Sequence, residues 1–334
     1  MTVHSLSDPA RLGALPDGPT PRLTLEEWTL TRPDLHLGAT EAGRLVARAS
    51  VWWTPCPVDP DRPEARVGMI GHLEGGREAL ASLLEDAMEV LRDNGIHRVL
   101  APMDGSTWHA YRVVTDAAPE GVPHPPFALE PTSTPEVTGA LEVAGFTPIA
   151  HYHSALVPHL PDRSADLVRL GTEAEKVGVG LRSFDPTRAE DELDALYRIS
   201  REAFARNPFY VPIPCEAFLA TYRPLVDRVD PRLIVLAEQG GSVVGVGFGL
   251  PDLAQAARCE AVDTVVVKTV AVLPEAAGQG LGSLLVLAVE EAARQAGLSR
   301  SIHALMHDGN RSVRISRHSD VQILRRYALL GRDV

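Results

Sequence analysis

The apolar residues of this chain recur with two periodicities, one typical of strands and one typical of helices. Strand-like apolar runs occur at residues 44–53, 65–73, 231–250, 263–273, 301–306 and 322–331. Helical spacing of apolar residues occurs at residues 78–95, 187–207 and 282–296. Gly95 and Gly297 end two of these helices. The pattern predicts an α/β fold with a mixed sheet.

Length and local composition divide the chain into four segments. A chain of 334 residues is long enough for two domains, each with its own core. Residues 1–22 are polar and rich in Pro, Gly and Asp, which predicts a flexible tail. Residues 161–178 are typical of a linker with one short helix. We therefore expect one domain at residues 23–160 and a second at residues 179–334.

The two expected domains are similar to each other in sequence. Residues 82–106 resemble residues 283–310, because both run through a helix, a glycine stop, a strand, and then a Met and a polar turn with Gly. Upstream, residues 65–73 stand where residues 265–273 stand in the second half. A duplicated domain explains this likeness, and the alternative is that any two strand–helix–strand units look alike at this level.

Composition excludes several classes of function. Acidic residues outnumber basic ones by 44 to 32, giving a net charge of −12, and no basic run offers the surface that nucleic acids need. The three cysteines lie far apart, which excludes a disulfide framework and a cysteine zinc site. Lysines occur only at positions 176 and 268, and we assign them no role. With no signal-like or membrane-spanning apolar run, we expect a cytoplasmic protein without a membrane partner.

The strongest local signal is a glycine-rich loop between a strand and a helix. Gly278, Gly280 and Gly282 alternate with other residues just before the helix at 282–296. Alternate glycines let successive backbone amides face one point, and the helix N-terminus adds partial positive charge. The loop therefore predicts a pyrophosphate site, the alternative being a turn before a core helix.

The spacing disfavours two common nucleotide motifs. A dinucleotide fingerprint needs G-x-G-x-x-G directly after the strand, whereas five residues intervene here and the third glycine comes one position early. A P-loop ends in Gly-Lys-Ser/Thr, and no Lys precedes Ser283. The spacing therefore disfavours a nucleotide-dependent oxidoreductase.

The segment V-A-V-x-P-E-x-x-G-x-G-x-G-S at residues 270–283, followed by a helix, a strand and Asn310, resembles the acetyl-CoA motif of the GCN5-related N-acetyltransferases. The resemblance covers residues 179–334. Some of these transferases contain two such domains, so the resemblance implies tandem GNAT-like acyl-CoA N-acyltransferase domains and acetyl-CoA as cosubstrate.

The resemblance also implies a set of cofactor-binding residues. Backbone groups of Val270, Ala271 and Val272 would hold the pantetheine arm. The pyrophosphate loop and its surroundings would be formed by Ala277, Gly278, Gln279, Gly280, Leu281, Gly282 and Ser283, and Asn310 would contact the cofactor. Two positions depart from the family: Ala277 replaces a usual Gln or Arg, and Arg317 replaces a usual Tyr general acid.

Acyl transfer to an amine also needs proton transfer and an oxyanion donor. A backbone amide of residues 270–272 would be the oxyanion donor. Tyr327 is the best remaining candidate for the acid that protonates the thiolate, although a tyrosine in a terminal strand can also simply pack. No base is assigned, since His303 is as readily structural. His303 and His307 lack a carboxylate pattern, so no metal site is expected.

The first half is expected to have lost the cofactor. The alignment places Arg77, Ala79 and Ala81 opposite the three glycines, where their side chains would block close approach of a pyrophosphate. This half would then pack against the second and wall the acceptor pocket, with residues 102–112 as its candidate contact loop. Residues 206–224 would supply the acceptor side of the second half.

These observations lead to one main function and one alternative. We expect an N-acetyltransferase in which the C-terminal domain transfers acetyl from acetyl-CoA to an amine of a small molecule or a peptide by direct attack. The net charge of −12 mildly favours a positively charged amine. The alternative is a non-catalytic acyl-CoA-binding or scaffolding protein.

Overall fold

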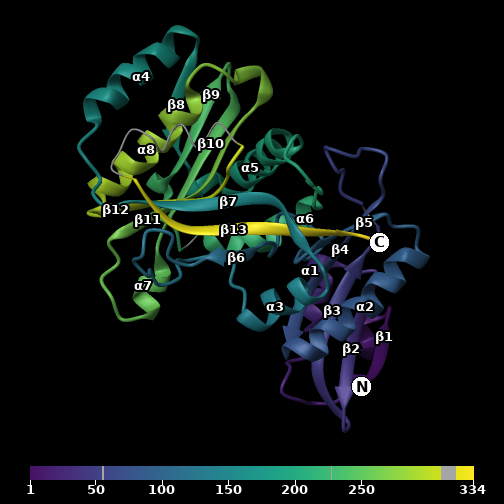
Figure 1. Cartoon of the computed structure of the whole chain (residues 1–334). Helices are drawn as coiled ribbons and strands as arrows, with labels where there is room; N and C mark the ends of the chain where they lie inside the picture. Colours follow the sequence, from purple (N-terminus) through teal and green to yellow (C-terminus); the bar gives the residue numbers. More distant parts are fainter. Residues whose placement is uncertain (55, 227, 310–320) are drawn as a thin grey trace.

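A large mixed sheet runs through the whole molecule, with helices packed against it (Figure 1). The computed structural model describes residues 1–54, 56–226, 228–309 and 321–334. The strands are β1 (Thr2–Leu6), β2 (Leu35–Glu41), β3 (Arg44–Trp52), β4 (Val67–Gly75), β5 (Arg98–Ala101), β6 (Val113–Asp116), β7 (Thr147–Val157), β8 (Val179–Ser183), β9 (Ile234–Gln239), β10 (Ser242–Pro251), β11 (Thr264–Val272), β12 (Arg300–His307) and β13 (Gln322–Asp333). The α-helices are α1 (Leu25–Thr31), α2 (Arg77–Asp93), α3 (Pro135–Val143), α4 (Ser164–Lys176), α5 (Ala189–Phe204), α6 (Cys215–Tyr222), α7 (Leu253–Ala257) and α8 (Leu281–Gln295).

The two halves repeat one topology, as the internal likeness predicts. In the first half β1 to β5 lie side by side in chain order, and in the second half β8 to β12 do the same. Within each series the last two strands are parallel, β4 with β5 and β11 with β12. A helix connects each parallel pair, α2 in the first half and α8 in the second, as a parallel connection requires.

The halves exchange their last strands. The sheet order is β1-β2-β3-β4-β5-β13-β7-β12-β11-β10-β9-β8, with β6 pairing with β13. Strand β13, at the C-terminal end of the chain, thus pairs with β5 of the first half, while β7 of the first half pairs with β12 of the second. The expected division between residues 160 and 179 therefore separates the helices of the two halves but not their sheets.

The first residues of the chain are part of the folded body, so the expected flexible tail is wrong for them. Strand β1 pairs with β2 from Thr2 to Leu6. Leu6, Leu12 and Leu15 are buried in a small cluster with Leu23 and Trp28. The composition of this segment is polar on average, but its leucines are spaced so that a strand and a short 3-10 helix (Pro9–Ala14) bury them together.

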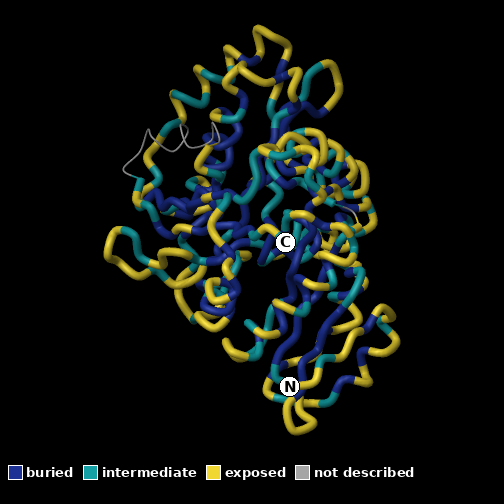
Figure 2. Tube along the Cα trace, turned by 45° about the vertical axis from the view of Figure 1, so that its right-hand side comes forward, coloured by how far each residue is buried: buried dark blue, intermediate teal, exposed yellow. Residues whose placement is uncertain are grey.

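The hydrophobic cores follow the exchanged strands, and Figure 2 shows the buried positions running through the interior of both halves. The core of the first half includes Ala328 and Leu330 from β13. The core of the second half includes Phe127 and Leu156 from the first half. Packing of apolar side chains therefore joins the two halves into one unit.

A chain that ends at residue 321 should not fold stably, because it exposes unpaired edges of β5 and β7 in the middle of the sheet. Urea unfolding followed by circular dichroism measures this. Removal of residues 1–8 is the control, since β1 is an edge strand with one neighbour, and that chain should still unfold cooperatively. If the chain that ends at residue 321 unfolds cooperatively at the urea midpoint of the wild type, the exchange of strands is contradicted.

Candidate active site

Strands β11 and β12 separate partway along their length. They pair from Thr264 to Val267 only, opposite Arg300 to His303. Beyond that point β11 continues to Val272, paired with β10, while β12 turns toward β7 through an irregular register that includes Leu305 at a φ of 58°. Among the described residues, no strand pairs with the edge of Lys268–Val272 that faces away from β10. Leu273 N donates to Val244 O at 2.9 Å, so the antiparallel register directs the backbone groups of Ala271 to β10 and those of Val270 and Val272 to the opening.

The glycine loop lies directly after this open edge. Gly278 and Gly280 have φ values of 87° and 76° and are exposed, and no heavy atom lies within 4 Å of the Cβ that either could carry. Gly280 is the residue before α8, and no side chain caps the first turn of that helix. Leu281 is buried, while Ala277, Gln279 and Ser283 are exposed. The loop thus presents uncapped amides and a helix N-terminus to solvent, an arrangement that suits a pyrophosphate.

The first half lacks both features. Its parallel pair also separates, after Met69, but the opening is filled by its own chain: Met103 N donates to Ile70 O at 2.8 Å and His72 N donates to Asp104 Oδ1 at 2.7 Å. Only Gly76 lies between β4 and α2, so there is no loop for a pyrophosphate. The three residues that stand opposite the glycines, Arg77, Ala79 and Ala81, lie inside α2.

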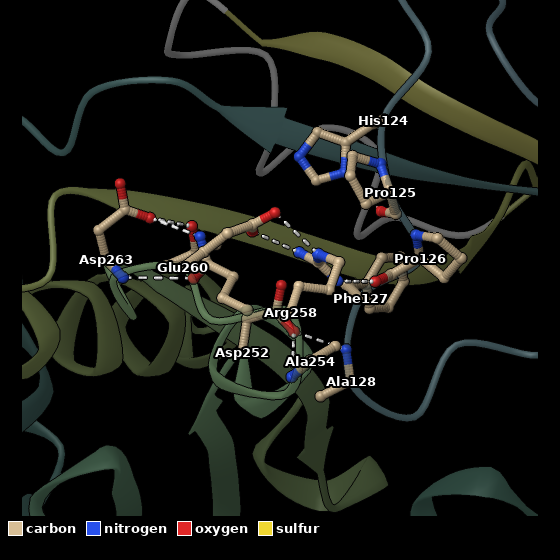
Figure 3. Close-up of polar contacts among 12 residues, drawn as sticks. His124, Pro125, Pro126, Phe127, Ala128, Asp252, Ala254, Arg258, Glu260 and Asp263 are labelled. Atoms are coloured by element: carbon tan, nitrogen blue, oxygen red, sulfur yellow. Dashed lines mark hydrogen bonds and ion pairs between the residues drawn. The ribbon is translucent and has the colours of Figure 1, made fainter.

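The first half instead contributes a segment to the second, which we call the strap (residues 124–130). Ala128 N donates to Asp252 Oδ1 at 2.7 Å, and Arg258 Nη1 donates to the carbonyl of Pro126 at 2.8 Å, as Figure 3 shows. Phe127 is buried in the core of the second half. The carbonyl of Leu129 accepts a hydrogen bond from Lys268 Nζ at 3.0 Å, so the strap lies beside the point where β11 leaves β12.

Tyr327, the candidate acid, lies at the junction of the halves. It is completely buried on β13, and its hydroxyl donates to the Glu130 carboxylate of the strap and lies 3.2 Å from Ser154 Oγ. Burial, reinforced by the Glu130 charge, raises the pKa of Tyr327. Glu130 also forms a buried ion pair with Arg325. Ser154 Oγ in turn accepts from Leu305 N at 3.0 Å, so Ser154 connects the Tyr327 hydroxyl to β12.

Three further ionisable side chains on or beside the second half's strands, which could in principle act as a base, are held in contacts with neighbouring elements. His303 Nε2 lies 2.9 Å from Glu290 Oε1 of α8. Glu238 is paired with Arg182 at 2.8 Å. Asp263 is paired with Arg300 at 2.6 Å. Each of the three side chains is therefore already engaged with a residue of the sheet or of α8.

The loop at residues 102–112 contacts the second half, as expected for a wall of the acceptor side. Ser106 Oγ donates to the carbonyl of Val211 at 2.8 Å. Trp108 packs edge-on against Phe218, with ring centroids 5.6 Å apart. Arg112 Nη1 donates to the carbonyl of Leu305, 3.2 Å away on β12. Arg112, part of the loop expected to contact the second half, thus reaches the strand beside the opening.

Some expectations fall outside the described residues. Asn310, the expected cofactor contact, and Arg317 both lie in the stretch 310–320, of which the structure describes nothing. In the part of the chain that is described, no group of three or more His, Cys, Asp or Glu residues could hold a metal ion. None of the described helices is long and apolar enough to cross a membrane.

Comparison with known families and structures agrees with this geometry. The model of the acetyltransferase (GNAT) family matches residues 193–315. No curated protein matches the sequence significantly. A GCN5-related glucosamine N-acetyltransferase region of a fungal multi-domain GH3 β-N-acetylglucosaminidase is similar at a TM-score of 0.54 and 16% identity, covering 99% of this chain and 38% of that one.

Two further solved structures span nearly the whole chain. A GCN5-related N-acetyltransferase from Kribbella flavida is similar at a TM-score of 0.50 and 14% identity, covering 99% of this chain and 71% of that chain. A tandem GNAT protein from the clavulanic acid biosynthesis pathway is similar at a TM-score of 0.49 and 12% identity, covering 99% and 98%. Likeness at these identities concerns the fold alone. The two structures with TM-scores of 0.54 and 0.50, the family match at residues 193–315 and the repeated strand order support a fold of two tandem GNAT-like domains.

The pKa of Lys268 gives the site a measurable property. Burial, with the nearby Arg112 charge, lowers this pKa from 10.5 to about 8, against an opposing effect of Glu130. The unfolded chain therefore binds more protons than the folded chain between these pH values, and the contribution of Lys268 to stability rises with pH across that window. The unfolding free energy of wild type minus that of Lys268→Met should increase from pH 7.5 to pH 10, by at most about 3 kcal/mol.

Urea unfolding at a series of pH values measures this difference. Lys176→Met is the matched control, because Lys176 is an exposed lysine on α4 paired with Glu173, and its difference from wild type should not rise over the same window. A pH-independent difference for Lys268→Met would show that this lysine is not desolvated.

Proposed function

We propose that this protein transfers the acetyl group of acetyl-CoA to an amine, and that the C-terminal half, where the model of the acetyltransferase (GNAT) family matches residues 193–315, carries the activity. The observation that carries the proposal is the opening between β11 and β12, followed at once by the exposed Gly278–Gly280 amides and the N-terminus of α8. The first half has neither an open edge nor a glycine loop.

The geometry supports each part of cofactor binding. The free edge of Val270–Val272 can pair with the amide groups of a pantetheine arm, as an added strand would. The pyrophosphate would then lie over the loop at residues 277–283, where its charge meets backbone amides and the helix dipole. Such contacts are made by the main chain, so Ala277 weakens the site only by the loss of one side-chain donor.

The reaction itself asks little of the side chains. A neutral amine attacks the thioester carbonyl, the carbonyl oxygen becomes an oxyanion, and the thiolate leaves as the amide forms. A free N–H of residues 270–272 is the oxyanion donor in this proposal. The amine loses its proton to water in the opening, since the three candidate bases are held in the contacts described above.

A second candidate function is acyl-CoA binding without turnover. It is favoured by Ala277 and by the contacts that occupy His303, Glu238 and Asp263. Release of free thiol in the presence of an amine separates the two, because binding without thiol release on any amine would leave only this function.

Gly280→Arg should abolish acetyl-CoA binding while the fold is kept. An arginine at a φ of 76° directly before α8 fills the space of the pyrophosphate and strains the loop. Calorimetric titration of acetyl-CoA measures binding, and one site per chain is expected for wild type. Gly297→Arg is the matched control, because Gly297 follows α8 at its other end, with a φ of 88° and open space around it. Equal loss of binding in both variants, or in neither, would refute the site.

Tyr327→Phe tests the role of the buried hydroxyl. If Tyr327 protonates the thiolate, kcat should fall at least tenfold with acetyl-CoA affinity unchanged. The hydrogen bonds to Glu130 and Ser154 favour the other outcome, in which kcat changes little and the midpoint of thermal unfolding falls because Glu130 loses a buried partner. Thiol release and thermal unfolding, measured on the same preparation, distinguish the two.

A further inference from the structure

Lys268 is a cation in an apolar stretch of β11. Its neighbours in sequence are Val267 and Thr269, and it is located where β11 has just left β12. Its ammonium donates to one neutral acceptor, the carbonyl of Leu129. None of the described carboxylates lies within ion-pair distance of it. An ammonium has three donors, so this group keeps binding capacity toward the opening.

Arg112 brings a second cation to the same place from the first half. Its guanidinium stacks against the rings of Tyr111 and Tyr152, 3.9 and 4.2 Å from their centroids. It is 8% exposed, and its Nε is buried without a hydrogen-bond partner. In the described part of the chain, no carboxylate pairs with Arg112 either. Its Nη1 donates to the carbonyl of Leu305 on β12, and its Nη2 donates to the hydroxyl of Tyr111.

The two cations are close enough to affect each other. The charge of Arg112 lowers the pKa of Lys268, after the larger effect of burial. Glu130 is an acid whose charge acts on Lys268, but its carboxylate already pairs with Arg325 and accepts from Tyr327. Desolvated positive charges that act on each other are unfavourable unless an anion joins them. A negatively charged group bound between Lys268 and Arg112 would therefore be stabilised.

The position of these two cations relates them to the reaction. Lys268 is two residues before Val270, where the proposed thioester end of the cofactor would lie, and Leu305 is on the strand opposite. The Nε–H of Arg112, which has no partner, can donate to a carboxylate, while the ammonium of Lys268 adds a point charge. We propose that Arg112 and Lys268 form a carboxylate subsite, so that the acceptor is an amine that also carries a carboxylate, such as an α-amino acid or a short peptide. This inference rests on the function proposed above.

Turnover of matched acceptors tests the subsite. α-Amino acids and dipeptides are compared with the same compounds amidated at the C-terminus, with a polyamine and with an amine that carries a phosphate ester. We expect kcat/KM to be at least tenfold higher for a carboxylate than for its amide. Lys268→Met should remove this preference mainly through KM, Lys268→Arg should restore part of it, and Lys176→Met should leave it unchanged.

Binding of products separates failure of the subsite from failure of the proposed function. N-acetylated amino acids and their amides are titrated into the full chain with CoA present. Binding of the carboxylates that is lost in Lys268→Met supports the subsite even if no amine is acetylated, in which case the transfer activity is refuted alone. The proposal would be overturned if the carboxylates did not bind or bound no better than their amides. It would also be overturned if turnover favoured the amine that carries a phosphate ester. Thermal unfolding of each variant controls for folding.

Discussion

The pairing of β13 with both β5 and β7 is the interaction on which the rest of the structure depends. Each half of this chain completes its sheet with a strand from the other half, so the two sheets are continuous and the two cores share residues. The first half is therefore needed for the fold, although only Gly76 lies between its β4 and α2. Its strands and its buried contacts are part of the fold of the second half, whether or not it binds a ligand of its own.

The exchange also decides which side chains meet at the proposed active site. Because β7 adjoins β12, the loop at residues 102–112 and the strap lie against the opening of the second half, and they bring Arg112 and Glu130 there. The buried pair of Glu130 and Arg325 fixes the strap to β13. Removing one partner of such a pair leaves an uncompensated buried charge, which typically costs about 3–5 kcal/mol. The pair of Glu130 and Arg325 therefore anchors this part of the proposed site to β13.

The parts that sequence predicted are those with local signals. The helix at residues 282–296, the glycine stop and the open loop depend on neighbouring residues, and the structure has α8 at Leu281–Gln295. The repeat was visible because it preserves this same unit. The exchange of strands was not predictable, because β7 and β13 have similar apolar patterns and either could complete either sheet. The role proposed for Lys268 depends on Arg112, which is far away in sequence. A lone lysine in a strand of mostly apolar residues is nevertheless a sequence signal for a functional charge.

The net charge of the whole protein is negative, whereas the proposed subsite is positive, so the two favour acceptors of opposite charge. A net charge of −12 repels a carboxylate at long range and would favour a cationic amine. At physiological salt, however, exposed charges are screened beyond about 8 Å, whereas buried neighbours are screened far less. Arg112 and Lys268 are such neighbours, and the one acid beside them is already paired. In the subsite that we propose, the local pair therefore outweighs the net charge in selecting the acceptor. The acidic surface would only slow the approach of an anionic acceptor, and added salt would make that approach faster.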